Sequence, residues 1–158
     1  MFRSVIWRPS TTIILIIGVI LILISLVVSY MLTTFRPTTQ VSIGSGVYSL
    51  WVADTDIERT QGLSGTEKLG PNGGLLMKFD TAHTHGIWMK DMNFPLDLVW
   101  LDNAKKVVYI VKNAPPENPV GTIYAPEDAA LYVIELPAGS VQKSGIKTGD
   151  TANFNIDV

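Results

Sequence analysis

The longest apolar stretch of the chain lies near its N-terminus. Residues 13–32 are almost wholly apolar, and no charged residue occurs from Pro9 through Phe35. About 20 residues at roughly 1.5 Å each cross the ~30 Å hydrocarbon core of a bilayer. A cleaved secretory signal and a buried core helix are the alternatives, but the run exceeds a usual signal core and no Ala-x-Ala site follows it. The pattern predicts an uncleaved transmembrane signal anchor over residues 10–35.

The residues that flank this apolar stretch indicate its orientation. Residues 1–9 carry Arg3, Arg8 and the α-amino group, whereas the far side has only Arg36 nearby. Because cytoplasmic flanks are enriched in Lys and Arg, we expect a cytoplasmic N-terminal tail over 1–9 and a single-pass membrane protein with its C-terminal part outside the cytoplasm. Residues 36–46 are rich in Thr, Ser and Gly, which is typical of a linker.

Residues 47–158 alternate between short apolar runs and turn residues, a pattern typical of a β-rich domain. The length suits one hydrophobic core. The predicted strands are residues 47–53, 75–79, 87–90, 96–101, 106–111, 130–136 and 151–158. The sequence therefore predicts a mainly β fold, a compact antiparallel or mixed β-sandwich or barrel-like domain with one or two short helices behind a single transmembrane helix.

Local signals mark the helices and one hairpin. Thr55 and Glu58 have the spacing of a capping box, and we expect that helix to end at Gly62 or Gly65. A second helical turn is expected over 139–144. The strands 96–101 and 106–111 are apolar on both faces, which favours two central strands joined by a turn at 102–105. The segment 112–128 contains four prolines, which predicts a long loop.

Composition excludes several classes of function. The chain has no cysteine, so thiol catalysis and Cys-ligated zinc are excluded. Its formal net charge is −2, with both signs scattered and no basic run, which argues against nucleic-acid binding. No phosphate loop or nucleophile elbow occurs, and no cofactor is indicated apart from a possible divalent metal.

An ordered set of short motifs resembles a known family. Asp54-Thr55, Gln61-Gly62-Leu63, Trp88-Met89-Lys90, Pro95-Leu96-Asp97 and Gly149-Asp150 occur in the order found in the DUF192 family, also called UPF0127. Its members are small, mostly secreted or membrane-tethered domains of unsettled function, so the resemblance implies a compact β-rich domain and no particular reaction. The chain departs from the family pattern at Ser64, Thr66 and Asp91-Met92, where the family usually has Met, Arg and Asn-Thr.

Asp97 is the strongest single candidate for a functional side chain. It enters a strand that is apolar on both faces, where a carboxylate must find hydrogen-bond donors or shift its pKa upward. Either it belongs to a site, or it is a structural acid that accepts from loop amides or from the indole N–H of Trp88.

The two histidines form a second candidate site. His83 and His85 lie two residues apart, which in an extended chain places both rings on one side. With Asp97 they could bind a divalent metal, although the spacing specifies no third ligand and loop histidines are commonly just solvated.

Three further residues are candidates for ligand binding. Arg59 could hold an anion through paired hydrogen bonds. Trp88 could stack on a sugar or another flat apolar group, although core packing also explains an aromatic residue there. Lys90 follows Trp88 in the same motif.

Three functions remain open from the sequence. The first is a membrane-anchored, extracytoplasmic binding or accessory module for a small molecule, a glycan or an envelope partner. The second is a metal-assisted hydrolase that uses His83, His85 and Asp97. The third is a purely structural domain that docks a partner protein. Because no catalytic spacing is present, the balance favours a protein that is not an enzyme.

Overall fold

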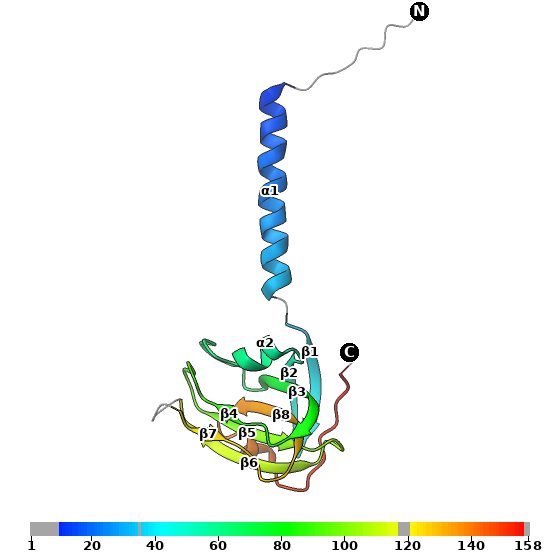
Figure 1. Ribbon diagram of the computed structural model, residues 1–158, viewed down its shortest axis with the longest axis vertical. Helices are drawn as coiled ribbons and strands as arrows, with labels where there is room; N and C mark the ends of the chain where they lie inside the picture. The colour runs from blue at the N-terminus through cyan, green and yellow to red at the C-terminus, as the bar shows by residue number, and fades with distance from the viewer. Residues whose placement is uncertain (1–9, 35, 117–120, 157–158) are drawn as a thin grey trace, which may run out of the picture. The chain divides into compact units, whose positions relative to one another are not determined.

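The computed structural model describes residues 10–34, 36–116 and 121–156 (Figure 1). The chain divides into two compact units, residues 1–36 and residues 37–158. The first unit contains α1 (Thr11–Thr34), which has no acidic residue in its first turn and no basic residue in its last. Within it, Thr11–Ser29 is long and apolar enough to cross a membrane or to act as a signal sequence. The predicted N-terminal apolar helix is confirmed, while the tail 1–9 lies outside the described residues.

The second unit is built on one six-stranded mixed sheet. Its strand order is β1-β2-β3-β8-β5-β6, and all neighbours are antiparallel except β2 and β3, which are parallel. The strands are β1 (Thr38–Ile43), β2 (Gly46–Ala53), β3 (Gly73–His83), β5 (Leu96–Leu101), β6 (Val107–Ala114) and β8 (Ala130–Pro137). The mainly β prediction is confirmed, in the form of an open mixed sheet rather than a closed barrel.

Three smaller elements complete the second unit. The helix α2 (Asp56–Gln61) connects the parallel strands β2 and β3, as a parallel pair requires a crossover. The short strands β4 (Ile87–Trp88) and β7 (Ile123–Tyr124) pair with each other in a separate two-stranded sheet. The helix α3 (Ser140–Ser144) follows β8 directly.

The two faces of the six-stranded sheet carry separate hydrophobic clusters. Because successive side chains on a strand point to opposite faces, Leu76 and Ile134 pack on one side while Leu75 and Val133 pack on the other. We call these sides the α3 face, which Val141 of α3 joins, and the α2 face, which Leu63 after α2 joins. Every residue of β5 is buried because this strand contributes to both clusters.

The local signals in the sequence are confirmed. Thr55 and Glu58 form the capping box of α2, and Gly62 ends the helix. The hydroxyl of Thr55, followed by backbone amides, holds the pKa of the Glu58 carboxyl below its usual range. The β5–β6 hairpin is also present, and Asp102 Oδ1 in its turn accepts from the amides of Ala104 and Lys106 at 2.8 and 2.9 Å.

Several boundaries differ from the sequence predictions. The expected linker 36–46 contains β1, whose buried Val41 and Ile43 join the core through pairing with β2. The strand β6 lies at the sheet edge rather than in its centre. Residues 151–156 form only isolated bridges at Thr151 and Asn153, so the predicted last strand is wrong over its described part. These differences all depend on pairing between segments, which a local apolar pattern does not specify.

The loops also differ from expectation. Residues 80–83, which follow the predicted strand 75–79, are strand as well, because β3 continues to His83 and pairs there with Ala130 beyond an irregularity in register. The predicted long loop 112–128 contains the end of β6 and the whole of β7; residues 117–120 within it lie outside the described part. Ala114 and Tyr124 from this segment pack with the hydrophobic cluster on the α2 face.

Candidate functional site

A cavity of about 520 Å³ opens on the α2 face of the sheet. Its lining comes from α2 and the turn after it, from β3, from residues 85–88, and from β5 and β8. Within 37–158, segments far apart in sequence therefore meet around one space. A volume of this size is within the usual range for a small-molecule site.

Glu135 of β8 lies at the buried end of this cavity. The residue is 4% exposed, and its neighbours across the sheet are Leu75 on β3 and Leu98 on β5. No described residue is within hydrogen-bond reach of its Oε2 atom. Burial without a partner raises the pKa of the Glu135 carboxyl from 4.5 to about 8. The cavity therefore ends at a carboxyl group that is mostly protonated at neutral pH.

The end of α2 lies beside this carboxyl group. Gly62, whose φ is +51°, leaves a space where a Cβ atom would lie 3.8 Å from Glu135 Oε2 and 3.3 Å from Met77 Cε. That left-handed conformation favours glycine, which also lets the backbone approach closely. The same residue that ends the helix thus keeps the space beside the carboxyl group open.

Arg59 is a charged residue that lines the cavity. Its guanidinium donates to the backbone carbonyls of Asp54 and Lys78 and to Asp56 Oδ1 at 2.6 Å, and it lies 4.0 Å from Asp80 Oδ1. The arginine side chain is only 10% exposed. Because most of its donors are already used, Arg59 mainly joins α2 to β3 and contributes positive charge to the rim.

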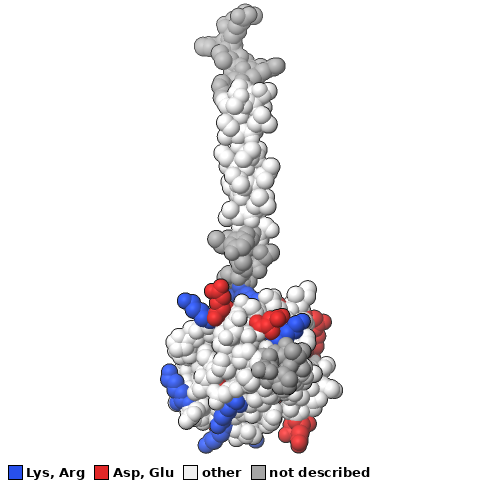
Figure 2. All heavy atoms as spheres, turned by 90° about the vertical axis from the view of Figure 1, so that its left-hand side faces the viewer, with Lys and Arg blue, Asp and Glu red and all other residues white. Residues whose placement is uncertain are grey.

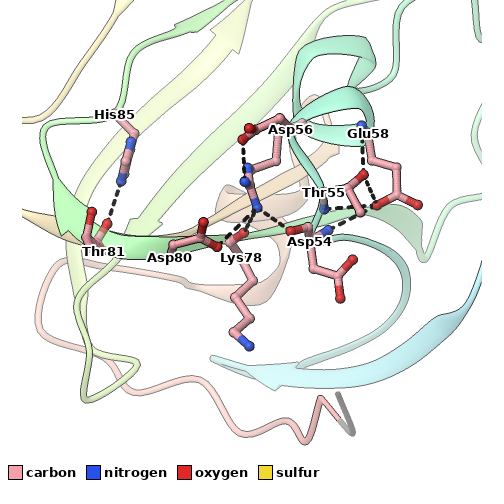
Figure 3. Close-up of polar contacts among 9 residues, drawn as sticks. Asp54, Thr55, Asp56, Glu58, Lys78, Asp80, Thr81 and His85 are labelled. Carbon is pink, nitrogen blue, oxygen red and sulfur yellow. Dashed lines mark hydrogen bonds and ion pairs between the residues drawn. The ribbon is translucent and has the colours of Figure 1, made fainter.

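Aromatic side chains line the other side. The ring of Phe79 stacks on His85 with centroids 3.6 Å apart and an 8° interplanar angle, and Arg59 lies 5.4 Å from the Phe79 centroid. His85 Nε2 lies 2.9 Å from the carbonyl oxygen of Thr81, so that nitrogen carries a proton and donates it (Figure 3). Trp88 is 45% exposed, and the Lys90 ammonium lies 5.1 Å from its ring centroid. These rings offer flat apolar contact to a bound group.

Asp97 lies away from the cavity. Asp97 follows Leu96 on β5, and Leu96 packs on the α2 face. Because successive side chains alternate, the Asp97 side chain projects toward the α3 face, where it is fully buried. Its Oδ1 accepts from the Asn113 amide at 2.9 Å and its Oδ2 from the Val141 amide at 2.8 Å. Of the two interpretations of the sequence, the geometry matches the structural acid that accepts from loop amides; Trp88 is not its donor.

The histidines and Asp97 are not brought together. The rings of His83 and His85 are 5.9 Å apart, but only His85 lines the cavity, and Asp97 occupies the opposite face of the sheet. Among the described residues no group of three or more His, Asp or Glu side chains is placed to hold a metal ion. Of the other candidates, Arg59 and Trp88 line the cavity, and Lys90 contacts Trp88.

Sequence reasoning missed Glu135. It occurs in the predicted strand 130–136, where it is the one charged residue among apolar neighbours. Asp97 shows the same signal, a lone acid in an apolar strand, yet one is fully hydrogen-bonded and the other has an oxygen without a described partner. The pattern identifies a buried acid, but only the three-dimensional surroundings show whether donors reach it.

Charged side chains are dispersed over the visible face of the second unit. Figure 2 shows Lys and Arg side chains at several places on this face, with Asp and Glu side chains beside some of them, mainly in its upper part. No continuous basic patch appears on it, in keeping with the low net charge of the chain.

The fold and cavity define a class of protein: a small mixed-sheet domain with a buried acid under a surface cavity, preceded by one apolar helix. The chain belongs to the DUF192 family, described as an uncharacterized ACR, whose model matches residues 39–154. It is 29% identical over 105 residues to a UPF0127 protein of Thermococcus gammatolerans, and 29% identical over 103 residues to one of Thermococcus kodakarensis. These matches cover 66% and 65% of this chain, and 65% and 62% of the respective relatives.

Two crystal structures have a similar fold. One, described as a candidate transcription regulator from Sinorhizobium meliloti, has 25% identity and a TM-score of 0.71, covering 75% of this chain and 95% of that one. The other is a protein of unknown function from Novosphingobium aromaticivorans, with 27% identity and a TM-score of 0.67 over 75% of this chain and 84% of that one. The family resemblance seen in the sequence is confirmed, and these matches assign no reaction.

Proposed function

We propose that this chain is a membrane-anchored accessory domain that binds a small molecule in the cavity above Glu135. The observation that carries the proposal is Oε2 of Glu135, which is buried at the end of an open cavity without a described partner. A buried polar atom of this kind is destabilising unless something else hydrogen-bonds to it. A ligand with a hydrogen-bonding group at its tip would supply that partner.

The lining of the cavity supports binding rather than catalysis. A buried acid, a polar side formed by Arg59 and aromatic faces from Phe79 and Trp88 are the elements expected of a small-molecule site. The cavity has no arrangement of nucleophile and base, and the described residues hold no cluster of metal-ligating side chains. We therefore assign Arg59, Trp88 and His85 to ligand contact, and Asp97 and His83 to other roles.

Filling the entrance of the cavity should abolish binding. Thr81 is exposed at the rim, so a Thr81→Trp substitution places an indole over the opening without changing the core. We expect one or more compounds in a fragment library to raise the melting temperature of the full chain in detergent, and we expect this effect to disappear in T81W.

The matched control for this experiment is Lys112→Trp. Lys112 is also exposed but lies on β6 and does not line the cavity, so K112W should respond to the same compounds as the unmodified chain. If no compound stabilises the chain, or if T81W responds like K112W, the cavity is not a ligand site.

We further propose that α1 anchors the domain, with residues 1–9 in the cytoplasm and residues 37–158 outside it. The absence of native cysteine allows a direct test with single introduced cysteines. A membrane-impermeant maleimide should label Lys112→Cys in right-side-out vesicles and Ser4→Cys only in inside-out vesicles. The opposite labelling would reverse the topology, and recovery of both variants in the soluble fraction would exclude an anchor.

A further inference from the structure

The geometry points to an organic ammonium compound as the ligand, with its charged nitrogen on the carboxyl group of Glu135 and its apolar part against the aromatic side of the cavity. This inference rests on the proposed function and adds the chemical class of ligand. Three properties of the cavity support it: the balance of charge in its lining, the aromatic faces near its entrance, and the protonation behaviour of Glu135.

The charge balance of the lining favours a cation. Asp56, Asp80 and Glu135 line the cavity, whereas Arg59 is the one Arg or Lys side chain among the described lining residues, with His85 beside it. The guanidinium of Arg59 is already engaged by Asp56 and by two backbone carbonyls. Asp56 and Asp80 are 96% and 88% exposed, so the charge that a bound cation meets in the buried part of the cavity is that of Glu135 once it ionises. An ammonium–carboxylate hydrogen bond is about twice as strong as a neutral one.

The aromatic faces near the entrance also suit a cation. Trp88 already has a primary ammonium, that of Lys90, 5.1 Å from its ring centroid, and Phe79 has the Arg59 guanidinium at 5.4 Å. Ring faces attract cations because the π-electrons give them partial negative charge. Because Phe79 also stacks on His85, Trp88, which is 45% exposed, offers the aromatic surface for the apolar body of a small amine.

Binding of an ammonium group requires Glu135 in its ionised form. The carboxyl O–H bond breaks, its proton passes to the solvent, and the ammonium N–H groups then donate to the carboxylate oxygens. Since burial raises the pKa of Glu135 to about 8, complex formation below that pH releases close to one proton. The other charged or titratable groups of the lining are Asp56 and Arg59 on α2, Asp80 on β3, and His85. On β5, the register partner of Glu135, Leu98, and the lining residue Leu96 are both apolar.

Calorimetry with a pair of matched probes tests this inference. The full chain, held in a polyoxyethylene detergent that carries neither charge nor sugar, is titrated with benzylammonium and with benzyl alcohol. We expect the ammonium compound to bind at least about tenfold more tightly at about pH 8, since an ion-paired hydrogen bond replaces a neutral one and little free energy is needed there to ionise Glu135. Titrations in buffers of different ionisation enthalpy should show release of nearly one proton per ligand at about pH 6, and less as the pH passes about 8.

Two variants distinguish the contribution of Glu135 to benzylammonium binding from the effect of the overall negative charge of the chain. In Glu135→Gln we expect binding of benzylammonium to weaken by about tenfold or more and proton release to disappear. Asp128→Asn removes an exposed acid that does not line the cavity, and it should leave both quantities unchanged.

Three results would overturn the assignment of an ammonium ligand: equal or tighter binding of benzyl alcohol, binding of benzylammonium without proton release, or no binding of benzylammonium at all. None of them removes the proposed function, provided that other fragments still bind the unmodified chain and fail to bind T81W. A failure of that comparison would remove both proposals.

Discussion

Replacing Asp97 by alanine is expected to destabilise the domain by roughly 3–6 kcal/mol. The carboxylate accepts hydrogen bonds from two backbone amides, and each bond to a charged group contributes about 1.5–3 kcal/mol. One amide belongs to Asn113, whose φ of +52° accompanies the irregular pairing of β5 with β6. The other belongs to Val141 at the start of α3, where the N-cap Gly139 provides no side-chain hydrogen bond. The substitution therefore leaves donors unpaired at two elements at once.

Two further variants provide stability losses with which the loss in D97A can be compared. Asp97→Asn keeps one acceptor oxygen but directs an amide N–H₂ toward a donor, so we expect a smaller loss than for D97A. In Asp102→Ala the lost carboxylate also accepts from two amides, but it lies in the partly exposed β5–β6 turn, where water can replace it. We expect a loss of about 1 kcal/mol there. Chemical unfolding of the full chain measures all three. Equal losses for D97A and D102A would show that burial of Asp97 adds nothing.

The second large effect is a change in how stability depends on pH. Glu135 has a pKa of about 8 in the folded domain and about 4.5 in the unfolded chain. Between these values the folded state binds the additional proton, so this residue makes the domain less stable as pH rises, by about 1.4 kcal/mol per pH unit. The stability it contributes is complete below about pH 4.5 and is lost as the pH rises through about 8.

Glu135→Gln should remove that dependence, because the amide stays neutral at every pH. We expect E135Q and the unmodified chain to melt at similar temperatures near pH 4. Near pH 9 the variant should melt at least about 10 °C higher, since the difference there amounts to several kcal/mol. Asp80→Asn, which removes an exposed acid at the cavity rim, should follow the unmodified chain. If the melting temperatures of E135Q and the unmodified chain change with pH in the same way across this range, the carboxyl group of Glu135 is not held in its neutral form.

The sequence was a good guide wherever a few neighbouring residues determine the structure. The Thr55–Glu58 capping box and the hairpin turn at Asp102 depend on side chains bonding to amides within four residues, and both were predicted correctly. The strand β1 was not predicted, since its Thr-rich segment becomes a strand through pairing with β2. Its edge position and its composition give only a weak local signal.

The candidate site was predicted only in part, because it is assembled from distant segments. Arg59, His85 and Trp88 were chosen for their chemistry, and the fold brings these three to one cavity. Asp97 was chosen because a lone acid in an apolar strand must find hydrogen-bond donors. In the structure, two backbone amides donate to its carboxylate. Glu135 is also a lone acid in an apolar strand, but it was not chosen. Whether hydrogen-bond donors reach its carboxyl group depends on the end of α2, on Met77 and on the open space between them.

The most direct test of the central claim is a carbon-13 NMR titration of the Glu135 carboxyl carbon, assigned through its loss in E135Q. The measurement reports the protonation of this one group in the folded chain. We predict a midpoint near pH 8, and a fall of that midpoint when benzylammonium is added. A midpoint near 4.5 would show that the carboxyl is solvated or paired, and it would contradict the claim that an unpartnered acid forms the buried end of the cavity.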